Sequence, residues 1–221
     1  MALMQEKDRK AVREAFAGLN RPVEIVLFTS AESGEYSEVT HELLQEVVAL
    51  NPLLSLRVFD LEQDRAYATE LGVDKAPGIV FLIGEERQNH GLRFAGLPSG
   101  YEFASLIEAI RLAGGAAQPD LQPATMAMLE TIQAPMHLQV FVTPTCPYCP
   151  RAVVMAYRLA LANPYISAEG IEVTEFPELG DRYEVMGVPK TVIDDLVHIE
   201  GAVPEGMMVS KLREAIAAAA A

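Results

Sequence analysis

The sequence predicts an α/β fold made of two tandem units, each with a mixed central sheet flanked by helices. Apolar stretches with strand-like alternation are separated by amphipathic stretches in which apolar residues recur at helical spacing. The same ordered set of landmarks occurs twice, which is typical of a repeated fold. A stretch rich in Gly and Pro, residues 113–123, lies between the two copies. We therefore expect one unit over residues 1–119 and a second over residues 120–221.

Each unit is predicted to follow the order β-α-β-α-β-β-α, with an additional helix ahead of it. The first strands are residues 23–29 and 137–143, and both end in threonine. The helix after each first strand ends at an Asn-Pro pair, which cannot continue a helix. The other matched landmarks are Pro77 before strand 78–83 and Pro189 before strand 190–193, tight connections at 84–89 and 194–195, final helices containing 106–110 and 212–216, and leading helices over 4–19 and 124–132.

The lengths of the connections between strands predict how the strands pair in each sheet. Within each unit the first strand and its crossover helix form a parallel βαβ element, which is right-handed in nearly all proteins. The last two strands are joined too tightly for a crossover, so they are expected to form an antiparallel hairpin. Parallel and antiparallel pairs together make each sheet mixed.

Composition and charge exclude several classes of function. The 221 residues are 50% hydrophobic, which is enough for packed cores, and the net charge is −14. Residues 1–119 contain 11 basic and 18 acidic side chains, and residues 120–221 contain 6 and 13, so each part has a charge of −7. Such a surface repels phosphate backbones, so no nucleic-acid partner is expected. Neither a signal-peptide segment nor a membrane-spanning stretch is visible, so we expect a cytoplasmic protein without membrane contact.

The chain holds both of its cysteines in one motif, Cys146-Pro147-Tyr148-Cys149, between a predicted strand and a predicted helix. The first cysteine would face the free amides and the positive end of the helix, which stabilise a thiolate. The second lies three residues on, close enough to close a disulfide ring. In the cytoplasm a pair of this kind is more often catalytic than structural.

The motif has two other interpretations. A structural zinc site requires four ligands from Cys or His, and the four histidines are scattered without ligand spacing. No metal is therefore expected. A purely structural disulfide is the second alternative, but a bridge that closes so short a loop removes little chain entropy. Thiol–disulfide chemistry is the favoured interpretation.

These residues resemble a known group of redox proteins. A strand, the CPYC motif, a helix and then Gly187-Val188-Pro189 before another strand resemble a thioredoxin-fold domain, and CPYC is most familiar from glutaredoxins. Two such units resemble the glutaredoxin-like protein disulfide oxidoreductases of prokaryotes. Residues 92–106, 113–115, 149–150 and 185–189 also resemble the N-terminal domain of the alkyl hydroperoxide reductase flavoprotein subunit. The resemblance implies that Pro189 is cis and packs beside the reactive disulfide.

The resemblance implies a protein-disulfide oxidoreductase that contributes to cytoplasmic redox homeostasis. Cys146 would attack and Cys149 would resolve, Val188 and Pro189 would position the substrate, and Pro147 and Tyr148 would tune the thiols. No cofactor besides the disulfide is expected, so electrons would come from a donor of the thioredoxin reductase type. The expected partners are disulfide-containing proteins. The alternatives are a dedicated dithiol shuttle to a peroxiredoxin, or a non-catalytic binding or chaperone module with a structural disulfide.

The first unit lacks thiols. The repeat places Glu32 and Glu35 where the two cysteines would stand. Acidic residues favour the first turn of a helix, so these carboxylates are expected on a solvated helix start, without a catalytic role. Two-unit oxidoreductases often have two active motifs, and the single motif here favours the peroxide-reductase-like alternative.

Overall fold

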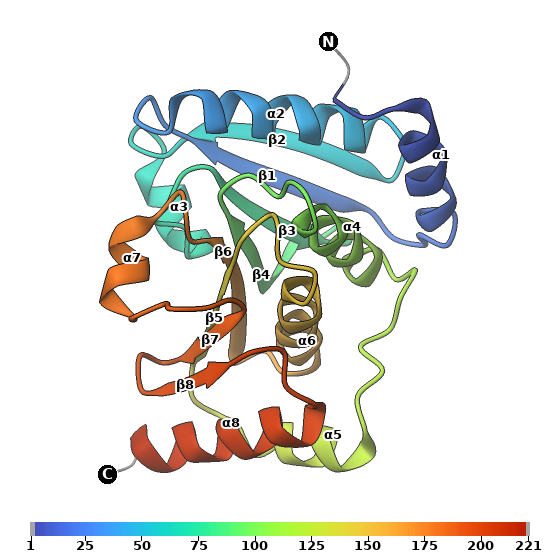
Figure 1. Ribbon diagram of the computed structural model, residues 1–221. Helices are drawn as coiled ribbons and strands as arrows, with labels where there is room; N and C mark the ends of the chain where they lie inside the picture. The colour runs from blue at the N-terminus through green and yellow to red at the C-terminus, as the bar shows by residue number, and fades with distance from the viewer. Residues whose placement is uncertain (1–2, 220–221) are drawn as a thin grey trace.

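The computed structural model describes residues 3–219, and this part of the chain forms eight strands and eight helices (Figure 1). The strands are β1 (Val23–Thr29), β2 (Leu54–Asp60), β3 (Gly78–Ile83), β4 (Gln88–Ala95), β5 (Met136–Val142), β6 (Ile166–Glu172), β7 (Lys190–Ile193) and β8 (Val197–Glu200). The helices are α1 (Glu6–Ala15), α2 (Gly34–Val48), α3 (Arg65–Leu71), α4 (Glu102–Ala113), α5 (Pro123–Leu129), α6 (Cys149–Ala162), α7 (Pro177–Arg182) and α8 (Glu205–Ala219).

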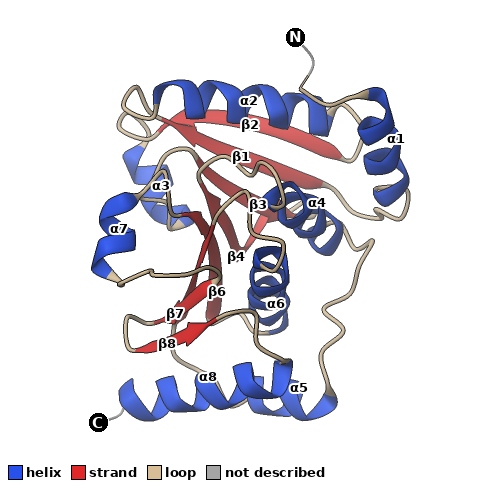
Figure 2. Ribbon diagram, in the orientation of Figure 1, coloured by secondary structure: helices blue, strands red, loops and turns tan. Residues whose placement is uncertain are grey.

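The predicted α/β fold class and the internal repeat are confirmed. The strand order within the sheet is β2-β1-β3-β4 in the first unit and β6-β5-β7-β8 in the second. In both units the first strand pairs in parallel with the second and antiparallel with the third, and the last two strands form a hairpin (Figure 2). Each unit is thus a mixed sheet.

The two units share one continuous sheet, which the sequence did not predict. Strand β4 pairs in parallel with β6, so that Leu92–Ala95 lie opposite Ala168–Ile171. The sequence predicts two tandem units, each with its own mixed central sheet. Strand-to-strand pairing across a junction leaves no periodicity in the sequence, because it uses backbone groups that every residue has. The eight strands therefore form one framework.

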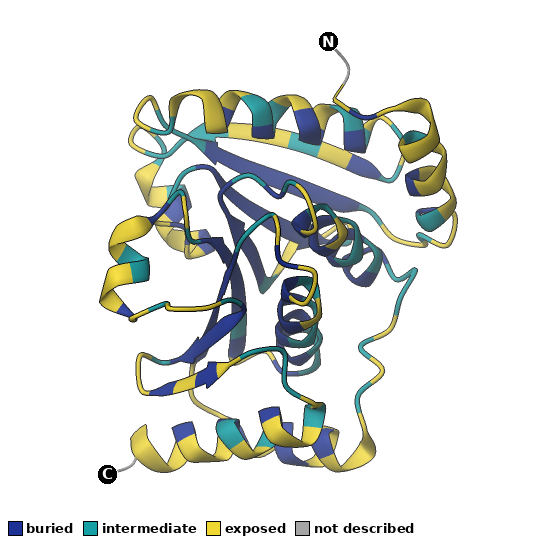
Figure 3. Ribbon diagram, in the orientation of Figure 1, coloured by how far each residue is buried: buried dark blue, intermediate teal, exposed yellow. Residues whose placement is uncertain are grey.

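Side chains on the two faces of the sheet are covered differently. On one face a single large core extends across both units beneath α1, α2, α4, α5, α6 and α8. On the other face there are two smaller clusters, one beneath α3 around Phe28 and one beside α7 around Phe141. Figure 3 shows the buried stripes of α4 and α6 turned toward the sheet. Charged residues occupy the space between the two small clusters.

The predicted ends of the leading helices differ from the observed ones. The first was expected over 4–19, but α1 ends at Ala15, and the amide of Leu19 then bonds to the carbonyl of Phe16 in a turn. Gly18, a residue that disfavours a helix interior, lies three residues past the observed end of α1. The second was expected over 124–132 and ends at Leu129. The stretch from 114 to 122 contains neither helix nor strand, as expected of a linker.

Two kinds of feature are absent from residues 3–219. No helix in this range has the length and apolar character needed to cross a bilayer. No group of three or more His, Cys, Asp or Glu side chains in the same range could hold a metal ion.

Candidate active site

Cys146 and Cys149 form a disulfide at the junction of β5 and α6, with their Cα atoms 5.5 Å apart. Cys146 lies in the turn after β5, where its amide bonds to the carbonyl of Thr143 at 3.2 Å. Cys149 is the first residue of α6. The exposed fraction is 8% for Cys146 and 0% for Cys149. A substrate can therefore approach only the first sulfur.

The start of α6 supplies the electrostatics of the motif. Cys146 precedes the first turn, in which backbone amides have no intrahelical acceptor and the positive end of the helix dipole lies. Pro150 is the second helical residue, where a missing amide removes no helical bond. A negative charge on the sulfur of Cys146 is stabilised at this position.

Val188 and Pro189 lie beside the disulfide. The bond between them is cis, as the resemblance implied. The Sγ of Cys146 lies 3.6 Å from the carbonyl oxygen of Val188. Pro189 is buried, and its carbonyl accepts a bond of 2.7 Å from the amide of Gly201. The loop before β7 is thus in contact with the sulfur predicted to react.

The surface around the disulfide is apolar and exposed. Pro147 is exposed, and Tyr148 is 62% exposed. Met186, two residues before Val188, is 95% exposed. Met186 could not be singled out from the sequence, because nothing in its neighbours distinguishes an exposed methionine from one in a core. Exposed apolar side chains beside a reactive group are typical of a protein-binding surface.

The first unit supports the motif of the second. The amide of Tyr101 donates to the carbonyl of Pro144, two residues before Cys146, at 2.9 Å. Gly100 has a φ of +57°, and a Cβ at this position would lie 2.3 Å from the same oxygen. Glycine is therefore required where the start of α4 approaches the active-site loop. The sequence contains no signal for the contact that Gly100 makes.

Glu102 is a buried carboxyl close to this contact. It is 0% exposed, and its Oε2 accepts a bond of 2.6 Å from the hydroxyl of Ser105. Its Oε1 has no hydrogen-bond partner among residues 3–219. Burial raises the pKa of Glu102 from 4.5 to about 7, and the nearby charge of Glu172 adds to this. The group thus changes charge near neutral pH.

Comparisons with known proteins agree with this geometry. A family model described as a thioredoxin domain matches residues 136–214, the part that contains the disulfide. The crystal structure of a protein disulfide oxidoreductase from Aeropyrum pernix K1 is 31% identical and superposes with a TM-score of 0.83. The match covers 93% of this chain and 90% of that one. This chain belongs to the same family of protein disulfide oxidoreductases. Its two units are thioredoxin-like.

The second resemblance is also confirmed. The structure of the alkyl hydroperoxide reductase AhpF from Enterococcus faecalis superposes with a TM-score of 0.86 at 29% identity, covering 94% of this chain and 98% of that one. The curated AhpF of Staphylococcus aureus strain Mu50 is 28% identical over 165 residues. That alignment covers 75% of this chain but 29% of the relative. The chain therefore spans less than a third of the length of the curated relatives it matches.

In the first unit, Ser33 and Tyr36 stand at the positions that the two cysteines occupy in the second. Phe28 and Phe141 are matched residues, because each pairs with the residue that follows a cis proline, Gly78 or Lys190. Counting forward from each phenylalanine matches Ser33 with Cys146. The hydroxyl of Ser33 contacts that of Ser37, which lies one residue past the match of Cys149 and is likewise buried.

The observed register corrects the alignment that placed Glu32 and Glu35 at the cysteine positions. Both glutamates are exposed, at the start of α2. Matching Thr29 with Thr143 had shifted the comparison of the two units by one residue. A solvated helix start was the expected environment for these carboxylates, and this is what the structure contains.

Replacing Glu32 and Glu35 together with Gln is expected to change the rate of disulfide reduction by less than about threefold. The two carboxylates are exposed and lie in the unit without thiols. Steady-state reduction of a small disulfide by the double variant and the parent would measure the effect. A loss above roughly 100-fold, about 2.7 kcal/mol of transition-state stabilisation, would show that the first unit takes part in catalysis.

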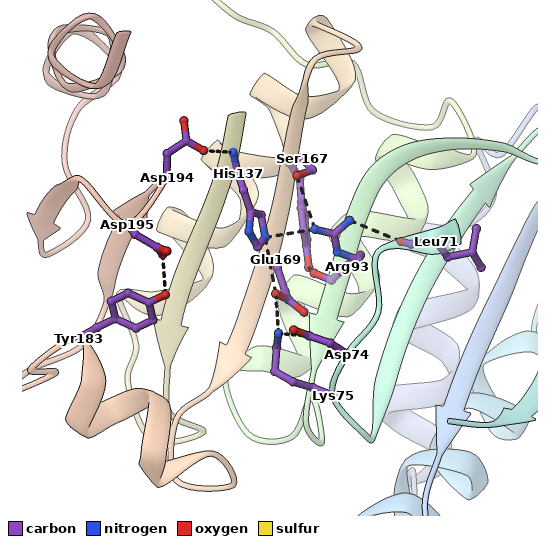
Figure 4. Close-up of polar contacts among 11 residues, drawn as sticks. Leu71, Asp74, Lys75, Arg93, His137, Ser167, Glu169, Tyr183, Asp194 and Asp195 are labelled. Carbon is purple, nitrogen blue, oxygen red and sulfur yellow. Dashed lines mark hydrogen bonds and ion pairs between the residues drawn. The ribbon is translucent and has the colours of Figure 1, made fainter. Parts of the chain in front are cut away.

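A buried charged cluster lies at the junction of the two units (Figure 4). It joins Arg93 of β4, His137 of β5, Glu169 of β6 and Lys75 of the loop before β3. The Nζ of Lys75 is 3.2 Å from Oε2 of Glu169, and it also contacts Asp74. Burial by itself lowers the pKa of Lys75. The carboxylates of Glu169 and Asp74 raise it by more, so the pKa of this lysine lies above its usual value. An ion pair therefore spans the two units.

His137 is neutral in this cluster. Its Nε2 lies 3.1 Å from NH2 of Arg93, a group that can only donate, so Nε2 must be unprotonated. Burial and the charges of Arg93 and Lys75 lower the pKa of His137 to about 4. The sequence had shown the position of His137 in a strand but no partner for it.

The pH dependence of stability is expected to change in the variant Glu102→Gln. In the parent, Glu102 ionises near pH 7 when folded and near 4.5 when unfolded, so its contribution is fully present below pH 4.5 and is lost as pH rises through 7. The full shift corresponds to roughly 3 kcal/mol. From pH 4.5 to pH 8.5, the free energy of unfolding of the variant, measured in urea, should rise by roughly 3 kcal/mol relative to that of the parent.

Glu38→Gln, at an exposed position of α2, is the control. The difference in unfolding free energy between this variant and the parent should be the same at every pH. If the difference in unfolding free energy between Glu102→Gln and the parent did not change with pH, the pKa of Glu102 would not be raised in the folded protein.

Proposed function

We propose that this chain reduces disulfides of protein partners in the cytoplasm and so contributes to redox homeostasis. The single observation that carries the proposal is the placement of the Cys146–Cys149 disulfide. It joins one sulfur near the surface to one fully buried, at a helix start and against the backbone of Val188. A pair of this kind can exchange electrons with a partner through one accessible sulfur.

The reaction proceeds in two exchanges. The thiolate of Cys146 attacks one sulfur of the partner's disulfide, and the other partner sulfur leaves as a thiolate. The thiolate of Cys149 then attacks the sulfur of Cys146, which breaks the mixed disulfide and releases the second partner thiolate. The partner gains two electrons and, after protonation, two thiol hydrogens. The chain is left with the Cys146–Cys149 disulfide.

Four residues around the disulfide are assigned roles, two in positioning the substrate and two in tuning the thiols. Val188 presents its backbone beside the reactive sulfur, and Pro189 holds that loop. Pro147 and Tyr148 form the exposed turn between the cysteines and tune their reactivity. The two electrons consumed in each cycle must be restored by a separate donor, and a reductase of the thioredoxin reductase type is proposed. No cofactor besides the disulfide is assigned to this chain.

The reduction potential of the Cys146–Cys149 couple tests the proposal. A value of about −200 to −270 mV is expected, between the ranges of glutaredoxins and thioredoxin. Stabilisation of the thiolate at the helix start raises the potential, and burial of Cys149 limits the rise. Equilibration in glutathione or DTT buffers, followed by thiol alkylation, gives the number. A value below about −300 mV would indicate a structural disulfide in a binding or chaperone module, and one near −120 mV an oxidant.

A dedicated dithiol shuttle to a peroxiredoxin is the second candidate. It is favoured by the match to the alkyl hydroperoxide reductase AhpF and by the single thiol pair, since the first unit contains no cysteine. The two candidates differ in range of substrate. A shuttle would reduce an oxidised peroxiredoxin at least about 100-fold faster, in kcat/KM, than insulin, whereas a general reductant would show similar values for both.

A further inference from the structure

A groove with a volume of about 570 Å³ begins one residue beyond the disulfide. One wall is the outer face of α6, from Pro150 to Arg158. The opposite wall includes the loop between β8 and α8, with Ala202 and Val203. This loop is tied to the active site, because the amide of Gly201 bonds to the carbonyl of Pro189. The groove thus adjoins both elements that surround Cys146.

Two arginines of α6 line the groove without carboxylate partners. Residues 120–221 contain six basic side chains, namely Arg151, Arg158, Arg182, Lys190, Lys211 and Arg213. Arg182, Lys190 and Lys211 each form an ion pair with a carboxylate. Arg151 and Arg158 form none with any residue from 3 to 219, and the buried Nε of Arg158 has no hydrogen-bond partner there.

The acidic residues of the groove are already engaged. Glu108 binds Arg111 at 2.6 Å. Glu205 accepts a bond of 2.8 Å from the amide of Gln122 and also contacts the hydroxyl of Thr125. Arg111 neutralises Glu108, but Glu205 keeps its charge because its two donors are neutral. The two guanidinium groups therefore leave one positive charge in excess in the groove, in a chain whose net charge is −14. Arginine groups in a partly dry groove bind carboxylates strongly and with defined geometry.

We infer that this groove docks an acidic, extended segment of the protein whose disulfide is reduced. Arg151 and Arg158 are two helical turns apart, roughly 10 Å along the axis. Three residues of chain in the extended polyproline II conformation span about this distance and bring residues i and i+3 to the same side. The apolar walls, including Val154 and Met155, would cover the stem of such a segment. The rest of the protein surface is acidic and repels an acidic segment, so such a segment binds only in this groove. This docking role rests on the proposed oxidoreductase activity.

Binding of a thiol-free peptide tests the docking separately from the chemistry. The probe is a fluorescein-labelled decapeptide with two Glu residues three positions apart, compared with the same peptide carrying Gln. Anisotropy should give at least roughly tenfold tighter binding of the acidic peptide to the parent protein. Arg151→Gln/Arg158→Gln should lose that preference. Lys7→Gln/Lys10→Gln, which removes the same charge from exposed positions of α1, should keep it within about twofold.

The same peptides with an added disulfide connect docking to turnover. The ratio of kcat/KM for the acidic over the Gln peptide should fall about tenfold in the arginine variant and stay within twofold in the lysine control. Equal losses in both variants, or equal binding of both peptides to the parent, would overturn the docking site. If the parent bound the acidic peptide selectively but reduced neither disulfide, the proposed function would fail while the docking site stood.

Discussion

Replacing Cys146 with serine is expected to abolish disulfide reduction, with a loss of at least about 100-fold to the rate of DTT alone. Cys146 holds the only sulfur of the pair that a substrate can approach, since Cys149 is completely buried. A serine hydroxyl is a far weaker nucleophile than a thiolate and forms no mixed disulfide. Insulin reduction driven by DTT measures the effect.

Cys149→Ser is the matched variant, and it should retain the attack. Without the resolving thiol, the mixed disulfide between Cys146 and the substrate accumulates and can be isolated under non-reducing conditions. The same variant can capture partners from a lysate. If iodoacetamide at neutral pH labelled Cys149 before Cys146 in the reduced protein, the two roles would be reversed.

The second large effect is expected at the junction of the units, from Lys75→Met. The side chains of Lys75 and Glu169 are 12% and 4% exposed, and their charges are 3.2 Å apart. Removing the ammonium leaves a buried carboxylate without its partner, which costs about 3 kcal/mol or more of unfolding free energy at pH 8. The cost should shrink toward pH 5, because Glu169 can then take up a proton. Urea unfolding at both pH values measures it.

Two controls distinguish an ion pair from loss of side-chain packing. Arg65→Met removes a similar pair with Glu62, at 2.8 Å but largely exposed, and should cost less than about 1 kcal/mol. Lys75→Met combined with Glu169→Gln removes both charges, and most of the stability should return. A double variant no more stable than Lys75→Met would assign the loss to packing.

Strands and helices of this chain could be predicted closely from periodicity. The strand expected at 23–29 is observed at those residues, and Asp194 and Asp195 form the expected tight turn with positive φ values. The pairing of β4 with β6 could not be predicted from periodicity, because it depends on backbone groups that every residue has. The buried charges of Arg93, His137 and Glu169 were the indirect signal. Each interrupts an apolar strand on the face that the neighbouring unit covers.

The residues of the candidate site could be found within the second unit but not where the two units meet. The CPYC motif was found from its spacing and the Val188-Pro189 loop from the resemblance to thioredoxin-fold domains, and the structure brings the two together. The contact of Gly100 with the loop before Cys146 depends on how the two units meet, which one sequence does not contain. The match of Ser33 and Tyr36 with the two cysteines was missed because pairing Thr29 with Thr143 shifted the alignment by one residue.

The junction between the units has a consequence for self-association. By the repeat, β4 and β6 correspond to β8 and β2, the two strands at the open ends of the sheet. The pairing used inside the molecule could therefore recur between molecules, head to tail, and such an arrangement grows into a filament instead of closing. The open ends oppose this growth. Strand β8 is only four residues long with His198 and Glu200 exposed, and β2 exposes Arg57. The short length of β8 and the charged side chains on both edge strands disfavour polymerisation of the duplicated fold through a copy of its own internal strand pairing.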